Sequence, residues 1–246
     1  MITIAHISDL HLDGGPRATE RASRVTSFLR SMPGPVDVVL ATGDIADHGA
    51  AEEYDEAAAL LDLPYPVLTL PGNHDRRAEF RKGLLGEAAT DEELNRVVRT
   101  DGAVFVLCDS TIPGQDDGVL TDRTLQWLDA TLNEHSGDVP VFVCFHHPPV
   151  VLHLPYVDRI RQSGEERLAA VLERHPQVVA VLCGHSHTAA ATTFAGRPLV
   201  VGPGIASTVP LPLEGRPEVD YDLPPLIAFH ILDDDRRLVT HYRVIV

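Results

Sequence analysis

Five apolar runs along the chain each end in aspartate, histidine or asparagine, and this recurrence constrains the fold more than any other feature. The sequences that follow the runs are DLH (Asp9–His11), GDIAD (Gly43–Asp47), GNHD (Gly72–Asp75), HHPP (His146–Pro149) and GHSH (Gly184–His187). Short apolar runs separated by segments with helical spacing predict strands that alternate with helices, as in an α/β sheet. Because ligands gather at the carboxyl ends of the strands in such sheets, these polar residues are expected to converge.

The predicted elements follow this alternation through most of the chain. Strands are predicted over Ile2–Ser8, Val36–Thr42, Tyr65–Leu70, Ala103–Cys108, Val141–Phe145 and Val178–Cys183, and helices over Thr19–Met32, Ala50–Leu61 and Thr121–Leu132. Residues 78–99 are expected to form one or two charged surface helices. Ser163 and Glu166 have the capping-box pattern of a helix that ends at Arg174.

The last third of the chain changes character. Segments 189–195, 198–202, 226–233 and 237–245 are predicted to be strands without helices between them. Two irregular segments, Pro148–Ser163 and Pro203–Pro225, are long enough to suggest a functional role, although plain surface connections are an equal alternative. We expect one domain over residues 1–246, since α/β domains of this length often form one unit.

Composition narrows the partners. The formal net charge is −16, and Lys82 is the only lysine, which argues against a surface that follows nucleic-acid phosphates. No run approaches the ~18 apolar residues that span a bilayer, so no membrane contact is expected. Cys108, Cys144 and Cys183 lie in apolar runs. We therefore predict reduced thiols and a cytoplasmic protein.

The residue types at the strand ends suit a metal centre. Imidazole and carboxylate groups bind Fe, Mn, Zn or Co, and the absence of thiolates from the set argues against a structural zinc finger. Any one of these residues taken alone is better explained as an ordinary hydrogen-bonded side chain. The prediction rests on their joint recurrence, and on the glycines before Asp44, Asn73 and His185 that permit close backbone approach.

These five motifs, in this order and spacing, resemble the calcineurin-like metallophosphoesterase superfamily. The DSTIPGQDDG stretch (Asp109–Gly118) and the YDLPP stretch (Tyr221–Pro225) are similar to the subgroup of class III cyclic-nucleotide phosphodiesterases and glycerophosphodiesterases. The resemblance implies a four-layer αββα fold, in which two mixed sheets pack face to face with helices outside, and it suggests a homodimer. It also implies two metal ions, one held by Asp9, His11 and His187, the other by Asn73, His146 and His185, with Asp44 bridging both.

Residues outside the ligand set also receive predicted roles. The resemblance places His74 outside the coordination set and facing the scissile phosphate, where it could stabilise charge or protonate the leaving group. Asp47 is expected to orient His74, although a role at a helix N-terminus fits nearly as well. His147 and His153 are candidates for substrate binding, with a buried, hydrogen-bonded histidine as the equal alternative for His147. Tyr156 and Tyr221 are further candidates, and Asp75 is expected to be solvated.

The predicted function is hydrolysis of a small phosphodiester. The substrate would be a 3′,5′-cyclic nucleotide such as cAMP or a glycerophosphodiester, attacked at phosphorus by hydroxide bound to two metals ~3.5–4 Å apart. The alternatives on the same core are a phosphomonoesterase, a nucleotide pyrophosphatase or a nuclease, because substrate choice depends on peripheral loops. A non-catalytic scaffold is a further alternative, which the complete set of ligand positions disfavours.

Overall fold

A computed structural model covers residues 1–246. Its strands are β1 (Ile2–Ile7), β2 (Val38–Thr42), β3 (Val67–Leu70), β4 (Arg96–Arg99), β5 (Val104–Leu107), β6 (Gly118–Val119), β7 (Val141–Cys144), β8 (Gln162–Ser163), β9 (Val178–Cys183), β10 (Ala190–Phe194), β11 (Arg197–Val201), β12 (Leu226–Leu232) and β13 (Leu238–Val244). Its helices are α1 (Pro16–Arg30), α2 (Ala51–Leu60), α3 (Arg77–Phe80), α4 (Asp122–Glu134), α5 (Pro155–Asp158) and α6 (Glu165–Glu173), with a π-helical turn at Arg81–Leu85 and a 3₁₀ turn at Pro212–Glu214.

Two mixed sheets form the centre of the molecule. The first sheet has the order β13-β12-β1-β2-β3, in which β1, β2 and β3 are parallel, β12 pairs antiparallel with β1, and β13 pairs antiparallel with β12. The second has the order β10-β11-β9-β7-β5-β4, with four parallel strands between two antiparallel edge strands. The all-strand C-terminal third was predicted correctly, and its segments are divided between the two sheets.

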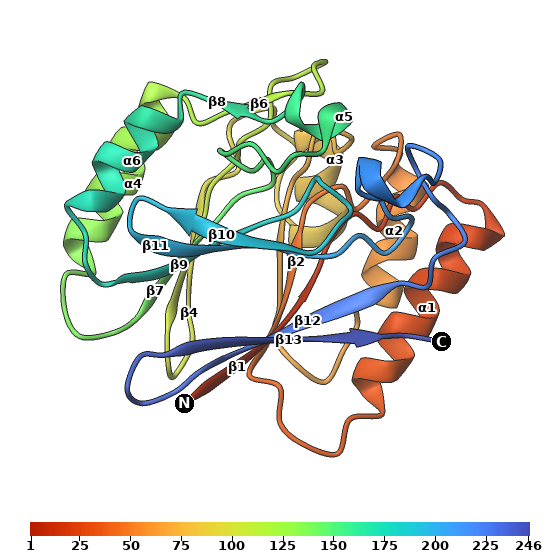
Figure 1. Ribbon diagram of the computed structural model, residues 1–246, viewed down its shortest axis with the longest axis horizontal. Helices are drawn as coiled ribbons and strands as arrows, with labels where there is room; N and C mark the ends of the chain where they lie inside the picture. The colour runs from red at the N-terminus through yellow and green to blue at the C-terminus, as the bar shows by residue number, and fades with distance from the viewer.

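Three hydrophobic clusters define the layers. Side chains such as Ile4, Leu40, Phe105 and Phe142 fill the space between the two sheets. A second cluster lies between the first sheet and helices α1 and α2, and a third between the second sheet and helices α4 and α6. These two helix pairs lie on opposite sides of the molecule (Figure 1). The expected arrangement of two mixed sheets with helices outside is confirmed.

The prediction for residues 78–99 is partly wrong. Only α3 and the following π-helical turn are helical, and Arg96–Arg99 forms edge strand β4, which pairs antiparallel with β5. Charge suggested a surface helix, but two β-branched valines, Val97 and Val98, favour an extended backbone once β5 offers its open edge. The edge position also keeps the flanking arginines near solvent.

The predicted capping box at Ser163 is also wrong. Ser163 belongs to β8, and its hydroxyl donates to the Gly118 carbonyl at 3.4 Å instead of capping a helix. Gly164, with a φ of +75°, precedes the first residue of α6. Pairing of β8 with β6 uses the serine that the local sequence pattern assigned to the helix.

Candidate metal centre

The predicted ligand residues from both sheets meet at one end of the strands. Asp9 and His11 follow β1, Asp44 follows β2 and Asn73 follows β3 in the first sheet, whereas His146 follows β7 and His185 and His187 follow β9 in the second. A pocket of about 450 Å³ is lined by His11, Asp44, Asn73, His185 and His187. Asp9 and His146 are fully buried beneath them. The convergence predicted from the strand ends is therefore present.

The backbone at this end is strained. Five of these residues have a left-handed conformation that non-glycine residues rarely adopt: Asp9, His11, Asp44, His185 and His187, with φ between +42° and +69°. Each such residue costs on the order of 1–3 kcal/mol, which persists only where the surrounding structure demands it. Here the left-handed backbone conformation directs the side chains at successive strand ends toward a common point.

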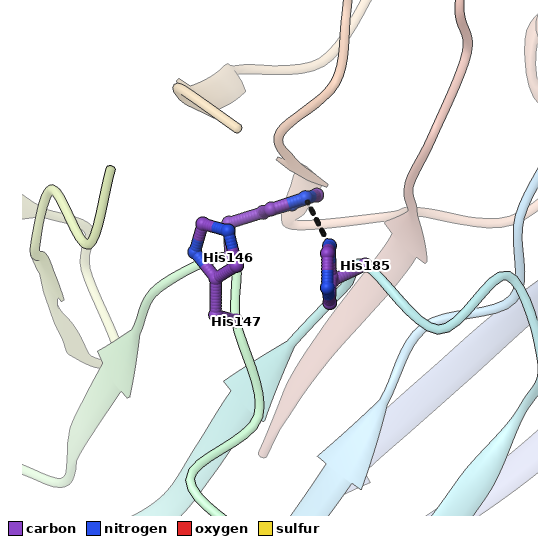
Figure 2. Close-up of side chains that lie close together, drawn as sticks. All are labelled: His146, His147 and His185. Carbon is purple, nitrogen blue, oxygen red and sulfur yellow. Dashed lines mark hydrogen bonds between the residues drawn. The ribbon is translucent and has the colours of Figure 1, made fainter. Parts of the chain in front are cut away.

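The side chains form two adjoining clusters. In one, His187 Nε2 lies 3.6 Å from Asp9 Oδ1 and 3.1 Å from His11 Nε2. In the other, His146 Nε2 lies 3.2 Å from His185 Nδ1 and 3.3 Å from Asp44 Oδ2; Figure 2 shows His146 and His185 pointing toward each other. Asp44 Oδ2 is also 3.5 Å from His11 Nε2. Asp44 thus lies between the clusters.

Three buried polar atoms of the converging residues have no hydrogen-bond partner. They are Asp9 Oδ1, Asn73 Oδ1 and His185 Nε2. An unpaired buried polar atom is costly, and native structures rarely keep one without a reason. Groups of carboxylate oxygens and imidazole nitrogens that lie within 4.8 Å of one another, together with unused lone pairs, fit cations with nitrogen and oxygen ligands.

Hydrogen bonds on the outer side of the rings orient three of the histidines. The Nδ1 atom of His146 donates to the Thr42 carbonyl at 2.6 Å, and that of His11 lies 2.8 Å from Asp47 Oδ1. The His187 Nδ1 atom lies 2.7 Å from the Ser207 hydroxyl. In each ring, an Nδ1 atom engaged in this way leaves Nε2 directed inward, which is how metal-binding histidines are usually held.

Asp47 and His74 are arranged differently from the prediction. His74 lines the pocket and is 39% exposed, and its Nδ1 donates to the backbone carbonyl of Asp47 at 2.8 Å. The Asp47 carboxylate is 3.5 Å from His74 but 2.8 Å from His11. Asp47 therefore orients His74 through its main chain, and its side chain serves His11.

His147 is buried beside the centre without lining the pocket. It lies close to His146 and His185 (Figure 2), but its Nδ1 pairs with the Ser110 hydroxyl at 2.8 Å and its Nε2 with the Asp116 carbonyl at 3.2 Å. Both ring nitrogens are thus occupied. The geometry matches the alternative of a buried, hydrogen-bonded histidine and does not support direct substrate contact.

The irregular segments contribute part of the pocket wall. Tyr156 and Tyr221 line the pocket, whereas His153 is exposed and outside the lining. Sequence reasoning missed Arg17, whose guanidinium lies 4.4 Å over the Tyr221 ring, and it missed Ser207. The one available signal for Arg17 was its position just after the Asp9–His11 strand end.

Asp75 is buried, so its expected solvation is wrong. Its carboxylate accepts bonds from the backbone amides of Ile45, Ala46 and Gly72 and from the Tyr54 hydroxyl. Burial and the nearby Asp44 raise the Asp75 pKa to about 6. Asp75 ties together the loops that follow β2 and β3, which a solvated residue would not do.

Charge is strongly coupled in the centre. Burial disfavours a charged His146, but the Asp44 carboxylate, the Asp9 carboxylate and the Thr42 carbonyl together outweigh burial and raise the His146 pKa to about 9. Burial likewise opposes ionisation of Asp44, yet His146 and His11 hold its pKa well below the ordinary value. A cation entering beside Asp44 would displace the His146 proton, so metal affinity should weaken as pH falls.

Comparison with known families agrees with this geometry. Residues 2–189 match the family model described as calcineurin-like phosphoesterase, and the chain belongs to this family. The family uses a dinuclear metal centre, for which the two clusters described above are the candidate ligands.

The relatives include two kinds of phosphodiesterase. The glycerophosphodiester phosphodiesterase GpdQ of Enterobacter lignolyticus is 35% identical over 92% of this chain and 86% of its own length. A protein of Rhodococcus erythropolis named as a probable cyclic nucleotide phosphodiesterase is 33% identical over 86% of this chain and 73% of its own. The fold is shared with a dimetal phosphatase from Danio rerio, with a TM-score of 0.76, 18% identity and coverage of 100% and 96% of the two chains.

None of the helices has both the length and the apolar character required to cross a bilayer.

Proposed function

We propose that this chain is a metal-dependent phosphodiesterase that hydrolyses a small diester, either a 3′,5′-cyclic nucleotide such as cAMP or a glycerophosphodiester. The observation that carries the proposal is the pair of imidazole–carboxylate clusters joined at Asp44, with unpartnered ligand atoms on Asp9, Asn73 and His185. The names of the relatives from Enterobacter lignolyticus and Rhodococcus erythropolis support both substrate types.

The proposed ligand set divides between the clusters. Asp9, His11 and His187 would hold one cation, Asn73, His146 and His185 the other, and Asp44 would bridge both. Cations in these positions would supply Lewis acidity for the phosphoryl oxygens and for an attacking water. We propose Fe, Mn, Zn or Co as the metals, because nitrogen and oxygen ligands without thiolate accept all four.

His74 is placed to act on the leaving group. Its Nδ1–H donates to the Asp47 carbonyl, which directs the other ring nitrogen away from this contact. In the protonated ring, Nε2–H could donate to a phosphoryl oxygen or to the departing alkoxide while Nδ1–H keeps its bond. Its partial exposure in the pocket gives it access to substrate.

Part of the pocket lining is apolar and aromatic, and we propose that it contacts the non-phosphate part of the substrate. Its members are Ala18, Tyr156, Val157, Ile160, Ala206, Val209, Val219 and Tyr221. Arg17 covers one face of Tyr221 and donates to its carbonyl. A nucleobase could stack on the aromatic surface that Tyr156 and Tyr221 supply.

Location, domain organisation and partners complete the proposal. A cytoplasmic location agrees with Cys108, Cys144 and Cys183 being free, buried thiols. The single domain over residues 1–246 and the homodimer remain predictions, and light scattering would measure the latter. Absence of a nucleic-acid partner remains a prediction from the acidic composition, and absence of a membrane partner remains a prediction from the lack of a long apolar run.

A substrate panel tests the proposed reaction. The purified chain would be reconstituted with Mn, Fe, Zn or Co and assayed against cAMP, cGMP, 2′,3′-cyclic nucleotides, glycerophosphodiesters and phosphomonoesters. We expect hydrolysis of diesters, with Tyr221→Ala raising KM for cyclic nucleotides more than for bis(p-nitrophenyl) phosphate. A clear preference for monoesters would contradict the proposal.

Asp44→Ala tests the centre itself. Because Asp44 approaches both clusters, its loss should abolish metal binding and reduce turnover to background. Elemental analysis and diester hydrolysis measure the two effects. Asp13→Ala is the matched control, since Asp13 is an exposed carboxylate that lines the same pocket outside the clusters. Wild-type hydrolysis by Asp44→Ala would rule out this mechanism.

A further inference from the structure

Polar side chains interrupt the apolar layer between the two sheets. His6, Thr42 and His230 are fully buried there, and Thr240 lies at the partly buried end of the row. Each of these four residues lies on the same face of its strand as apolar residues two or four positions away. The apolar neighbours are Ile2 and Ile4 on β1, Val38 and Leu40 on β2, Leu232 on β12 and Leu238 on β13. Apolar residues in these places would avoid the cost of burying imidazoles.

These side chains form one continuous hydrogen-bonded chain. His230 Nδ1 lies 2.8 Å from the Thr240 hydroxyl, and His230 Nε2 lies 3.0 Å from His6 Nδ1. His6 Nε2 lies 2.8 Å from Thr42 Oγ1, and the Thr42 hydroxyl donates to Ser8 Oγ at 2.9 Å. The Ser8 hydroxyl then donates to the Thr42 carbonyl at 3.2 Å.

The last bond sets the direction of all the others. A carbonyl oxygen can only accept a hydrogen bond, so the Ser8 hydroxyl donates its one proton to the Thr42 carbonyl. The Ser8 oxygen must therefore accept from the Thr42 hydroxyl. Thr42 Oγ1 therefore accepts from His6 Nε2–H, and His6 Nδ1 accepts from His230 Nε2–H. Burial lowers the pKa of both histidines, which agrees with neutral rings that carry one proton each.

The hydrogen-bonded chain of side chains ends at the metal centre. The Thr42 carbonyl that accepts from Ser8 also accepts from His146 Nδ1. The His6–Thr42 bond joins β1 and β2 just before the residues that follow them, Asp9 and Asp44. The hydrogen-bonded side chains thus contact the backbone that positions three proposed ligands, His146, Asp9 and Asp44.

The second sheet leaves room for this chain by means of two glycines. A Cβ on Gly184 would lie 2.0 Å from Ser8 Oγ and 2.6 Å from the Thr42 carbonyl oxygen. A Cβ on Gly202 would lie 2.6 Å from His6 Nε2. A side chain at either glycine would displace the hydrogen-bonded residues. Both sheets therefore have shapes that accommodate these residues.

We infer that His6 is a positioning residue for the metal centre, which acts through Thr42 and Ser8 on the carbonyl that orients His146. The inference rests on the proposed function, because it takes His146 as a ligand. It assigns to a histidine outside the coordination set the task of holding the ends of β1 and β2 in register with the second sheet.

The test measures metal affinity independently of catalysis. Metal-free protein would be titrated with Mn²⁺, with free Mn²⁺ followed by electron paramagnetic resonance. His6→Leu and Thr42→Val should weaken binding about 10- to 100-fold, the range found when groups that orient ligands are removed. His6→Gln should restore much of the affinity, because its amide nitrogen can donate to Thr42 from the place of Nε2.

Ile4→Val is the matched control. Ile4 lies in the same layer of the same strand but outside the hydrogen-bonded chain, so this variant perturbs packing alone and should bind Mn²⁺ like the wild type. Equal weakening in Ile4→Val and His6→Leu, or wild-type affinity in Thr42→Val, would overturn the inference. Should His6→Leu fail to fold, Thr42→Val decides the result. If these variants bind Mn²⁺ normally while the wild type hydrolyses diesters, only this inference is refuted. A wild type that binds none of Mn, Fe, Zn and Co and hydrolyses no diester removes the proposed function as well.

Discussion

Asp47 and His74 are in contact, but their side chains have different roles. The Asp47 carboxylate lies 2.8 Å from His11 Nδ1. Burial lowers the His11 pKa, but this hydrogen bond and the nearby carboxylates of Asp44 and Asp9 outweigh burial and raise it. The His74 ring hydrogen-bonds to the Asp47 main-chain carbonyl, and the Asp47 carboxylate lies farther from it, at 3.5 Å. Substitution of the two residues should therefore separate metal binding from catalysis.

Asp47→Ala should weaken metal binding. Without the carboxylate, His11 loses the group that holds Nδ1 and keeps Nε2 directed at the cluster, so affinity at the Asp9–His11–His187 cluster should fall about 10- to 100-fold. A titration with Mn²⁺ measures this. Unchanged affinity, with a loss of rate alone, would show that the Asp47 side chain acts on His74 and not on His11.

His74→Ala should retain both metals and lose rate. General acid catalysis of this kind contributes about 10²- to 10⁴-fold, so kcat should fall by that amount for substrates with poor leaving groups and by less for p-nitrophenyl esters. Elemental analysis with a leaving-group series checks both parts. An equal loss across the series would argue against proton donation.

At the scale of elements, α1 holds the long segment Pro203–Pro225 against the site. Arg21 of α1 is 4% exposed and donates to the carbonyls of Ile205, Tyr221 and Leu223 at 2.6, 3.2 and 2.7 Å. The amide of Ile205 in turn donates to the Ser8 carbonyl beside the metal centre. One buried guanidinium therefore connects the pocket wall to the helix.

Arg21→Met should loosen this segment. Methionine keeps much of the apolar volume but leaves three carbonyls without their donor, and bonds from a charged donor contribute about 1.5–3 kcal/mol. We expect roughly 3 kcal/mol loss of unfolding free energy and faster amide exchange over residues 205–223. Arg24→Met is the control: Arg24 is 39% exposed and pairs with Glu20 at 3.5 Å, so its loss should cost about 0.5 kcal/mol or less. Equal effects would contradict the role of Arg21.

At the scale of the whole molecule, the metal centre depends on the packing of the two sheets. The first sheet supplies Asp9, His11, Asp44 and Asn73, and the second supplies His146, His185 and His187. The apolar layer packs the two sheets together, and the hydrogen-bonded chain that contains His6 and His230 joins strands of the first sheet. Neither sheet alone presents a complete set of ligands.

The buried His230 makes this packing sensitive to pH. Burial lowers its pKa from 6.5 to about 4, so the unfolded chain binds the proton more tightly than the folded one. Its contribution to stability is full above pH 6.5 and is lost as pH falls toward 4. Between pH 7 and 5 the loss from His230 is about 2 kcal/mol.

Urea unfolding of the metal-free protein at both pH values measures this effect. The non-titrating variant His230→Gln should lose about 2 kcal/mol less than the wild type over the same pH range. Identical losses in the two proteins would show that His230 does not control the pH response.

Much of the fold could be predicted because its signals are local. Short apolar runs such as Val178–Cys183 form strands wherever they are buried, and the strand ends carry their polar residues with them. Arg96–Arg99 could not be predicted, because its extended form depends on an edge of β5 that exists only in the assembled sheet. Ser163 failed for the same reason, since its partner is distant Gly118.

The sequence by itself determined the chemical types of the site: carboxylate, imidazole and amide groups, without thiolate, placed where apolar runs end. These are properties of neighbouring residues, so they survive without knowledge of the fold. Only the tertiary structure decided which group each side chain serves. His147 pairs with Ser110, the Asp47 carboxylate with His11, and Asp75 with the loops after β2 and β3. Such pairings join segments far apart in the chain, and their geometry is set only when the two sheets pack together.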